Sequence, residues 1–407
     1  MKQLTCRFCN ARLSQTFVDL GLSPVANDYI PFSEKDTRES FYPLHVFVCT
    51  KCWLVQLPEH RTEGEIFTDT YAYFSSYSSS WLAHAKDYVE TMTKRFGLNK
   101  SNLVIELASN DGYLLQYFRE KRIPVLGVEP TKNTAAAARA KGIRTVTEFF
   151  GRDTARKLKK ADLLIGNNVL AHVPDLNDFV GGMKIILKSD GICTMEFPHL
   201  MKLMEKNQFD TIYHEHYSYF SFLTVQKVFA KHGLTLFDVE EIPTHGGSLR
   251  IYGRHSANKD IKKTKRIDAL IRKEIVFGLH KTETYTKFSE KVKKTKQAFL
   301  KFLIEAKKNG KSIVGYGAPA KGNTFLNYCG VRTDFIDYTV DASPYKQKHF
   351  LPGVRIPIYE PERIAKTHPD YVLILPWNIK TEVMEQMRAV RKWGGKFVTA
   401  IPRVTIQ

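Results

Sequence analysis

The 407-residue sequence lacks long hydrophobic runs. No apolar stretch approaches the ~20 residues that a bilayer-spanning helix needs, and the segment from Met1 to Cys6 has no apolar signal-peptide core. We therefore expect a cytoplasmic protein. Hydrophobic residues still make up 43% of the chain, which excludes a disordered protein. The chain is too long for one core and should hold two or three domains.

Cysteine is scarce, and its spacing is informative. Four of the six cysteines form two C-x-x-C pairs, Cys6/Cys9 and Cys49/Cys52. Two such knuckles place four thiolates tetrahedrally around one zinc ion and leave no open ligand position, so we expect a structural zinc rather than two disulfides. Cys193 and Cys329 stand alone and are expected in the core.

Negative charge is also in short supply, since the formal net charge is +19. Such a surplus is compatible with nucleic-acid binding or an anionic substrate. Residues 259–311 hold 17 basic and 6 acidic residues, so +11 of the surplus lies in one stretch with helical apolar spacing (Ile267, Leu270, Ile271, Phe299, Phe302, Leu303). The lysines there are expected to form a solvated helix face, which argues against nucleic acid.

The strand–turn–helix pattern at residues 103–118 has no G-x-G-x-x-G dinucleotide fingerprint. An apolar strand containing Glu106 leads into a turn with Gly112, and a second strand, 124–128, ends at Glu129. This pattern begins an open α/β sheet, whose ligands bind off the carboxyl ends of the strands. The turn resembles the first motif of S-adenosylmethionine-dependent methyltransferases, and Glu129 suits the two hydroxyls of a ribose.

Further strands are predicted at 161–166, 192–197, 234–239 and 247–252, which makes a seven-stranded methyltransferase-type sheet plausible. Before it, residues 71–81 are rich in hydroxyls and aromatics and form either a lid or a linker, followed by a helix to about Phe96. A second α/β unit begins at residue 312. Its Gly315-x-Gly317-x-x-Ala320 fits a dinucleotide turn with Asp341 as ribose acid, whereas Lys321-Gly322-Asn323 favours a pyrophosphate at a helix N-terminus.

The densest polar cluster is Asp210–Phe220, which contains His214-Glu215-His216 but no H-E-x-x-H zinc motif. We favour acid–base chemistry over metal binding. An imidazole can remove a proton next to a carbonyl, and a nearby tyrosine or histidine can stabilise the enolate oxygen. His172 follows the 161–166 strand and is either a further site residue or a helix cap. Arg250 is either an anion contact or a surface residue.

Together these pieces resemble the sugar C-methyltransferases that install the branch methyl of 3-C-methyl deoxysugars. Members carry a zinc-binding N-terminal domain, a central S-adenosylmethionine domain and a C-terminal α/β domain that helps bind a nucleotide-linked sugar. The resemblance covers nearly the full length and rests on the paired C-x-x-C knuckles, Ser23–Asp28, Glu106–Gly112, Asn168–Pro174, Tyr213–Ser218, His245–Arg250 and Gly315–Asn323. We accordingly expect a zinc-binding domain at 1–75, a Rossmann-like methyltransferase domain at 76–257, a basic helical connector at 258–310 and a second Rossmann-like domain at 311–407.

The resemblance also implies residue roles. His216 would remove the proton at sugar C-3, alpha to a C-4 ketone of a TDP- or GDP-linked sugar, while Tyr213, Glu215 and His172 support the enolate. Tyr71 or Tyr73 would close over the substrate. The cofactor set would be Glu106, Ala108, Asn110, Gly112, Glu129, Pro130, Asn167 and Asn168. The nucleotide-sugar set would be Lys321, Gly322, Asn323, Asp341, Lys346, Trp377 and Asn378.

Three other functions remain open from the sequence. The first is a small-molecule O- or N-methyltransferase, which needs no proton removal from carbon. The second is a zinc-containing nucleic-acid methylase, disfavoured because Asn167-Asn168-Val-Leu is not the proline-rich turn of base methylases. The third makes the C-terminal unit an NAD-dependent dehydrogenase. We expect a monomer with no membrane partner.

Overall fold

The computed structural model describes residues 4–69 and 73–407 as two compact units. Unit 1 comprises residues 4–14, 49–199 and 217–280 apart from the undescribed 70–72, and unit 2 comprises residues 15–48, 200–216 and 281–407. Each unit is therefore assembled from three separate stretches of chain. The domain boundaries expected from sequence stay a prediction.

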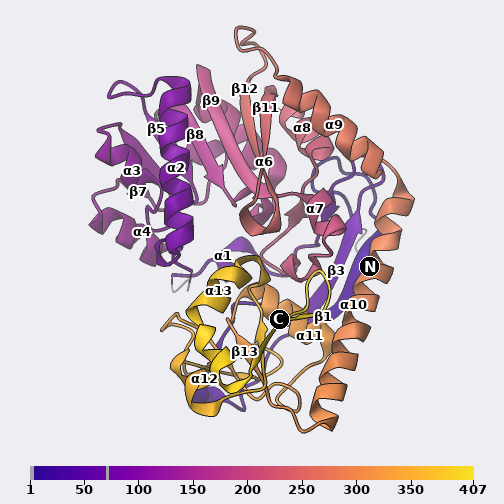
Figure 1. The fold of residues 1–407 in the computed structure, drawn as a ribbon. Helices are drawn as coiled ribbons and strands as arrows, with labels where there is room; N and C mark the ends of the chain where they lie inside the picture. The colour runs from indigo at the N-terminus through magenta and orange to yellow at the C-terminus, as the bar shows by residue number, and fades with distance from the viewer. Residues whose placement is uncertain (1–3, 70–72) are drawn as a thin grey trace. The chain divides into compact units, whose positions relative to one another are not determined.

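Unit 1 is built on a seven-stranded sheet, drawn in purple to salmon in Figure 1. Its order is β11-β12-β9-β8-β5-β6-β7, and only β12 runs antiparallel to its neighbours. The strands are β5 Val104–Leu107, β6 Val125–Val128, β7 Thr145–Val146, β8 Ala161–Asn167, β9 Leu187–Pro198, β11 Leu234–Ile242 and β12 Ser248–His255. The predicted seven-stranded sheet is confirmed. Six of its strands were located in the sequence, and the structure shows that β7 is the seventh.

Apolar periodicity explains how helices cover this sheet. Helix α2 (Ser79–Phe96) begins at the Ser78 N-cap, whose hydroxyl accepts from Trp81 N–H, and ends at Gly97 in a left-handed conformation. Its buried stripe (Ala85, Tyr88, Val89, Met92) shares a core with Phe118 of α3. The other helices of unit 1 are α1 Glu63–Ile66, α3 Leu115–Glu120, α4 Lys132–Ala140, α5 Arg152–Lys157, α6 Leu176–Ile186, α8 Phe222–Lys231 and α9 Lys265–Phe277. The short strands β4 (Val55–Gln56) and β10 (Ser218–Tyr219) form an antiparallel pair.

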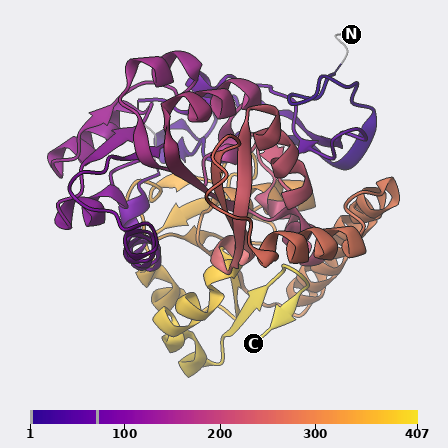
Figure 2. The same cartoon turned by 90° about the horizontal axis from the view of Figure 1, so that it is seen from above.

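Unit 2 contains the second predicted α/β sheet. Its order is β19-β18-β17-β13-β14-β16-β15-β2, and the five strands from β18 to β16 are parallel. They are β13 Ile313–Tyr316, β14 Thr339–Val340, β16 Pro357–Tyr359, β17 Tyr371–Ile374 and β18 Lys396–Thr399; β2 (Ile30–Pro31), β15 (His349–Phe350) and β19 (Thr405–Ile406) complete the edges. Figure 2 shows the yellow C-terminal strands beside the end of the chain. The helices are α7 Leu200–Glu205, α10 Thr282–Lys308, α11 Ala320–Cys329, α12 Glu362–Thr367 and α13 Lys380–Gln386.

The basic stretch forms the long helices α9 and α10, as predicted. Ile267, Leu270, Phe299 and Leu303 are buried, while most lysines of α10 face solvent. In unit 2, α10 packs on the hairpin of β1 (Gln15–Ser23) and β3 (Tyr42–Val48), where Phe17 stacks on Phe288 with ring centroids 4.6 Å apart. The solvated-face interpretation of these lysines is therefore confirmed.

The two lone cysteines and the lack of apolar runs have structural counterparts. Cys193 and Cys329 are buried, as expected. Within residues 4–69 and 73–407, none of the helices combines the length and apolar character needed to cross a bilayer.

A buried carboxylate ties three elements of unit 1 together. Glu274 of α9 is fully buried and accepts hydrogen bonds from the first backbone amides of α8, Phe222 N at 2.6 Å and Leu223 N at 2.8 Å. His199, directly after β9, donates its Nε2–H to the same carboxylate at 2.7 Å. The negative charge therefore satisfies a helix N-terminus and an imidazole at once.

We predict that Glu274→Ala lowers the free energy of unfolding by about 3–5 kcal/mol, because it leaves buried donors without an acceptor. Asp268→Ala is the control, since Asp268 lies exposed in the first turn of the same helix and should cost at most about 1 kcal/mol. Urea denaturation measures both. Equal losses in the two variants would contradict the account.

Candidate active site and metal centre

Two turns of unit 1 with the same local structure gather four cysteines. In the first, Asn10 N–H bonds the Cys6 carbonyl at 2.9 Å, and in the second, Trp53 N–H bonds the Cys49 carbonyl at 2.8 Å. Asn10 and Trp53 both adopt left-handed conformations, with φ of 60° and 69°. Each C-x-x-C pair thus closes a tight knuckle that points both thiols the same way.

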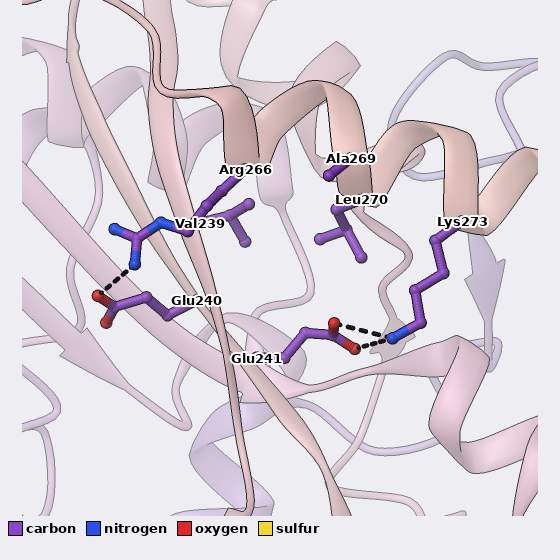
Figure 3. A pocket seen from close by; sticks show the side chains of 7 residues that line it. All are labelled: Val239, Glu240, Glu241, Arg266, Ala269, Leu270 and Lys273. Atoms are coloured by element: carbon purple, nitrogen blue, oxygen red, sulfur yellow. Dashed lines mark hydrogen bonds and ion pairs between the residues drawn. The ribbon is translucent and has the colours of Figure 1, made fainter.

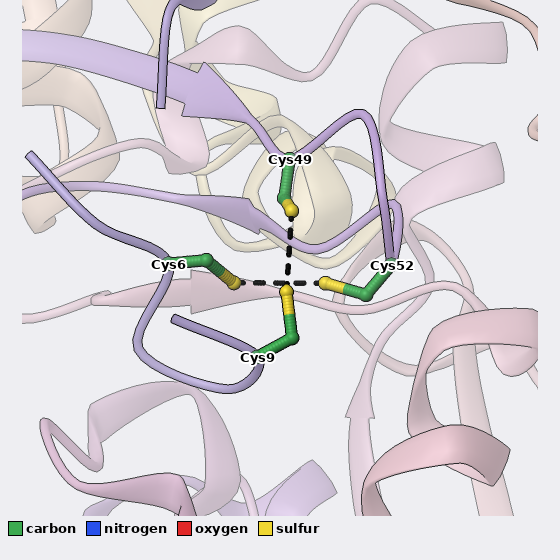
Figure 4. A group of neighbouring side chains, drawn as sticks. All are labelled: Cys6, Cys9, Cys49 and Cys52. Carbon is green, nitrogen blue, oxygen red and sulfur yellow. Dashed lines mark hydrogen bonds between the residues drawn. The ribbon is translucent and has the colours of Figure 1, made fainter. Parts of the chain in front are cut away.

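The four sulfurs face one another in Figure 4. Cys6 Sγ lies 3.6 Å from Cys52 Sγ, Cys9 Sγ lies 3.5 Å from Cys49 Sγ, and all four lie within 4.8 Å of one another. These distances exclude disulfides, whose sulfurs are about 2.05 Å apart, and approach the separation of about 3.8 Å in a tetrahedron of Zn–S bonds of about 2.3 Å. Gln56 Nε2 also donates to Cys6 Sγ at 3.2 Å, a bond that stabilises a thiolate. The predicted four-cysteine group is confirmed.

The turn after β5 has an unusual backbone. Ala108, Asn110 and Gly112 all have positive φ, at 53°, 48° and 75°, alternating with ordinary residues. Left-handed non-glycine residues cost free energy and concentrate at binding sites. At Gly112 an added Cβ would collide with the side chain of Ile143 and come within 3.3 Å of Ala138. This turn therefore requires glycine at its last position, as the sequence predicted.

Acidic side chains surround this turn. Burial raises the pKa of Glu106 well above its ordinary value; the hydroxyl of Tyr113 opposes that rise, and the neighbouring carboxylates of Glu129, Asp111 and Glu196 add to it. Such a concentration of buried negative charge is costly unless a cation enters. The sulfonium and ammonium groups of S-adenosylmethionine are cations of this kind.

Several buried polar atoms at the same edge have no partner among the described residues. They are Ser109 Oγ, Asp111 Oδ1 and both side-chain amide atoms of Asn167, at the end of β8. Buried polar groups are nearly always hydrogen-bonded, so these positions fit a polar ligand. The residues present therefore suit S-adenosylmethionine.

Other predicted cofactor residues already have protein partners. Glu129 accepts hydrogen bonds from Asn110 N at 2.9 Å and Thr131 N at 3.0 Å. The Asn110 side chain bonds the segment ahead of α2, donating to the Tyr73 carbonyl at 3.1 Å and accepting from Ser75 N–H at 2.8 Å. Ala108 and Pro130 are half-buried beside them. Asn110 therefore links the cofactor turn to the segment predicted as a lid or a linker. The Tyr73 side chain is exposed, and Tyr71 lies outside the described residues.

Strand β8 is followed by another residue with a left-handed backbone. Asn168, with φ of 56°, donates its side-chain amide to His245 Nε2 at 3.2 Å. His172 follows in a 3-10 turn, Leu170–His172, with its ring 5.7 Å from that of Phe67 in an edge contact. Arg250 is buried and pairs with Glu196 at 2.6 Å and Glu240 at 3.3 Å, so the expectation of a surface residue is wrong.

Of the polar cluster Asp210–Phe220, residues 210–216 belong to unit 2 and residues 217–220 to unit 1. His216 is buried, and its Nδ1 lies 2.8 Å from the Thr211 carbonyl oxygen. A carbonyl oxygen only accepts, so the neutral ring carries its proton on Nδ1 and its basic lone pair on Nε2. The Tyr213 ring lies against this imidazole, with centroids 4.0 Å apart. This local geometry suits a general base.

Glu215 is held by a segment for which the sequence gave no role. Its Oε1 accepts a hydrogen bond of 2.5 Å from Asn27 Nδ2, in Ser23–Asp28. Two residues on, the Tyr29 hydroxyl donates to the Ala318 carbonyl at 2.5 Å. Asn27 and Tyr29 thus connect the His216 segment with the turn after β13. In the sequence, only the place of Asn27 in the Ser23–Asp28 motif pointed to this segment.

The N-terminus of α11 carries the predicted diphosphate residues. Lys321 Nζ bonds Asn378 Oδ1 at 2.7 Å and lies 4.9 Å from the Trp377 ring centroid. Asn323 is fully buried with no partner for its Nδ2 among the described residues, and Gly322 packs against Leu375. Burial lowers the pKa of Lys321, an effect that the charge of Asp210 opposes. The structure therefore brings Lys321, Trp377 and Asn378 together.

Asp341 and Lys346 lie on the other side of the β13 turn. Asp341 Oδ2 accepts from Ala318 N–H at 2.7 Å, while Lys346 Nζ lies 3.1 Å from the Ala318 carbonyl and 3.6 Å from Asp341. Both side chains therefore brace the turn that leads into α11.

A hollow of about 350 Å³ lies between β11 and α9 in unit 1 (Figure 3). Its charged lining residues are already paired, Glu240 with Arg266 and Glu241 with Lys273. None of the predicted site residues lines it, and we assign it no role in the chemistry.

Comparison with known proteins agrees with this architecture. Three family models match in succession: a putative zinc binding domain at residues 6–67, a methyltransferase domain at 81–239 and a C-methyltransferase C-terminal domain at 243–402. C-methyltransferase NovU of Streptomyces niveus is 33% identical over 98% of this chain and 95% of its own. The chain belongs to the C-methyltransferase family.

Solved structures similar to this C-methyltransferase chain cover less than half of it. One is an S-adenosylmethionine-dependent methyltransferase from Clostridium acetobutylicum, with 12% identity, a TM-score of 0.35 and coverage of 42% of this chain and 91% of its own. Another, from Thermotoga maritima, is described as a possible histamine N-methyltransferase and has 18% identity, a TM-score of 0.36 and coverage of 47% and 99%.

We predict that Gly112→Ala weakens S-adenosylmethionine binding at least tenfold, roughly 1.4 kcal/mol, because the new methyl group forces the cofactor turn apart. Gly97→Ala is the matched control: its φ is also left-handed, at 61°, but nothing lies within 4 Å of the added Cβ. It should lose about 1–2 kcal/mol of stability and keep its affinity. Titration calorimetry distinguishes them, and unchanged affinity in folded Gly112→Ala would contradict the assignment.

Proposed function

We propose that this C-methyltransferase transfers a methyl group to C-3 of a nucleotide-linked 4-keto-6-deoxyhexose through an enolate. The observation that carries the proposal is the His216 imidazole, whose Nδ1 is hydrogen-bonded to the Thr211 carbonyl, so that the basic lone pair lies on Nε2. Carbon next to a ketone becomes nucleophilic only after it loses a proton, and an imidazole is suited to remove one near neutral pH. The S-adenosylmethionine fit of the unit 1 turn and the 33% identity to NovU support the same chemistry.

In the proposed reaction, His216 Nε2 takes the C-3 proton. The C–H electron pair forms a double bond between C-3 and C-4, and the C-4 oxygen takes the negative charge of the enolate. Tyr213, Glu215 and His172 are assigned to the support of this oxygen and of the sugar. Bound S-adenosylmethionine supplies the electrophilic methyl group. The enolate carbon would take this methyl group as the S–CH3 bond breaks, with S-adenosylhomocysteine as the leaving group, so that the C-4 ketone is restored. His216 would then release its proton to solvent.

The nucleotide is assigned to unit 2. Lys321 and Asn323 lie in the first turn of α11, a ten-residue helix whose N-terminus favours anions. Lys321, Gly322 and Asn323 would meet the diphosphate, while Trp377 and Asn378 are beside Lys321. Asp341 and Lys346 fix the turn between β13 and α11 through their hydrogen bonds to Ala318. Either TDP or GDP fits this assignment, and Tyr71 or Tyr73 is proposed to close over the sugar.

We predict that the wild-type protein exchanges the C-3 hydrogen of the substrate with deuterated water when no methyl donor is present. His216→Asn should abolish this exchange and methyl transfer while leaving S-adenosylmethionine affinity unchanged. His214→Asn, which removes the other imidazole of the same segment, is the control and should still exchange. Proton NMR of the sugar measures both. Exchange at C-5, the other position alpha to the ketone, would overturn the C-3 assignment, and an O- or N-methyltransferase would show no exchange at all.

We also propose that the four cysteines hold one structural zinc ion. Elemental analysis should find one zinc per chain, and Cys52→Ser should lose it together with part of the thermal stability, because zinc binding contributes directly to folding. Cys329→Ala, which removes a buried cysteine of unit 2, should keep the metal. Full zinc content in the Cys52 variant would contradict the four-cysteine site.

A further inference from the structure

Asp210 is a buried carboxylate to which neither the sequence nor the proposed reaction gives a role. It lies in a 3-10 turn, Phe209–Thr211, and is only 1% exposed. Its Oδ2 accepts a hydrogen bond of 2.6 Å from the indole Nε1–H of Trp377. Its Oδ1 is buried and has no hydrogen-bond partner among the described residues. A buried acceptor without a hydrogen bond lowers stability, so a donor from outside the chain is the expected partner.

The charge state of Asp210 makes it an acceptor. Burial raises its pKa to about 6, although the charge of Lys321 and the hydrogen bond from Trp377 oppose that rise. At pH 7.5 the group is therefore mostly ionised, and both oxygens can only accept hydrogen bonds. Its missing partner must be an O–H or N–H group.

The place of Asp210 indicates which part of a ligand it meets. The next residue, Thr211, holds His216 through its carbonyl oxygen, and Ile212 accepts a hydrogen bond of 2.9 Å from Thr324 in α11. Asp210 therefore directly precedes two residues that contact the proposed base and the helix of the proposed diphosphate site, all in unit 2. A carboxylate repels a diphosphate, whereas the hydroxyls of the hexose lie between the diphosphate and the reacting carbon and are neutral donors.

We propose that Asp210 is a sugar-recognition residue whose Oδ1 accepts a hydrogen bond from a ring hydroxyl of the nucleotide-linked hexose. The inference rests on the proposed function and adds a selectivity to it. Sugars that keep this hydroxyl bind well, and analogues without it leave the buried carboxylate oxygen unpaired. A site built for a hydroxyl rejects the deoxy analogue strongly for this reason.

The test compares wild type with Asp210→Asn, which has the same shape. Its amide oxygen can still accept from Trp377, but an NH₂ group replaces the acceptor at Oδ1. Calorimetry without methyl donor measures binding of the free nucleoside diphosphate, of the hydroxylated 4-keto sugar nucleotide, and of its 2-deoxy and 3-deoxy analogues. Asp334→Asn, an exposed carboxylate of the same unit, is the control, and thermal melting checks the fold.

We expect Asp210→Asn to bind the hydroxylated sugar nucleotide about 10- to 100-fold more weakly, the range for a hydrogen bond to a charged group, with free nucleoside diphosphate unaffected. Wild type should bind one of the two deoxy analogues more weakly than the hydroxylated sugar nucleotide, by a similar factor. Asp210→Asn should bind that analogue and the hydroxylated sugar nucleotide equally, because the variant already lacks the contact. An equal loss for the free nucleoside diphosphate would place the contact on the nucleotide and overturn the proposal. Additive losses for every analogue would also overturn it.

Failure of the proposed function has a different signature. Wild type would then bind none of the sugar nucleotides or leave their alpha hydrogen unexchanged, whatever residue stands at position 210. Asp210→Glu gives a second variant, since it keeps the charge and displaces it by one methylene. It should also weaken binding of the hydroxylated sugar nucleotide, and wild-type affinity in this variant would contradict a fixed contact.

Discussion

The proposed chemistry depends on one hydrogen bond, from His216 Nδ1 to the carbonyl oxygen of Thr211. Without it the imidazole could carry its proton on either nitrogen and turn about its Cβ. With it, the tautomer and the ring orientation are both set, and the Tyr213 ring lies against the imidazole. The carbonyl itself is fixed because the neighbouring residues are tied down, Asp210 to Trp377 and Ile212 to Thr324. The α/β unit thus orients a base that lies on a short irregular segment.

The cofactor turn of unit 1 is subject to a different physical constraint. It must bring backbone close to a charged ligand, and it does so through three left-handed residues in five, two of them not glycine. Such a backbone persists because its neighbours hold it: Glu129 accepts from Asn110 N, and the Asn110 side chain ties down residues 73 and 75. Carboxylates that burial makes costly are compensated when a cation binds among them.

Local patterns in the sequence predicted the four-cysteine group, the α/β sheets and the glycine in the cofactor turn. The C-x-x-C spacing was enough for the four-cysteine group, because each knuckle is a local turn. Alternating strands and helices were enough for both sheets, and the glycine requirement at position 112 followed from a strand–turn–helix pattern. The His216 cluster stood out by composition alone. Its assigned roles, however, depended on a resemblance to a family.

Contacts between distant positions could not be predicted in the same way. Asn27 bonds Glu215 across 188 residues, and Asp210 bonds Trp377 across 167. No periodicity links such pairs, and residues 15–48 and 200–216 join unit 2 only through tertiary packing. Arg250 likewise was predicted to be either an anion contact or a surface residue, because nothing in the sequence of its strand indicates that it pairs with Glu196 in the interior. These long-range pairs are where the structure adds most to the site.

The most direct test of the central claim is the position of the transferred methyl group. Incubation of the protein with a nucleotide-linked 4-keto-6-deoxyhexose and S-adenosylmethionine carrying a ¹³C-labelled methyl, followed by carbon NMR of the product, locates it. The account predicts a label bonded to C-3, next to a retained C-4 ketone. A label on oxygen or nitrogen, or on C-5, would contradict it.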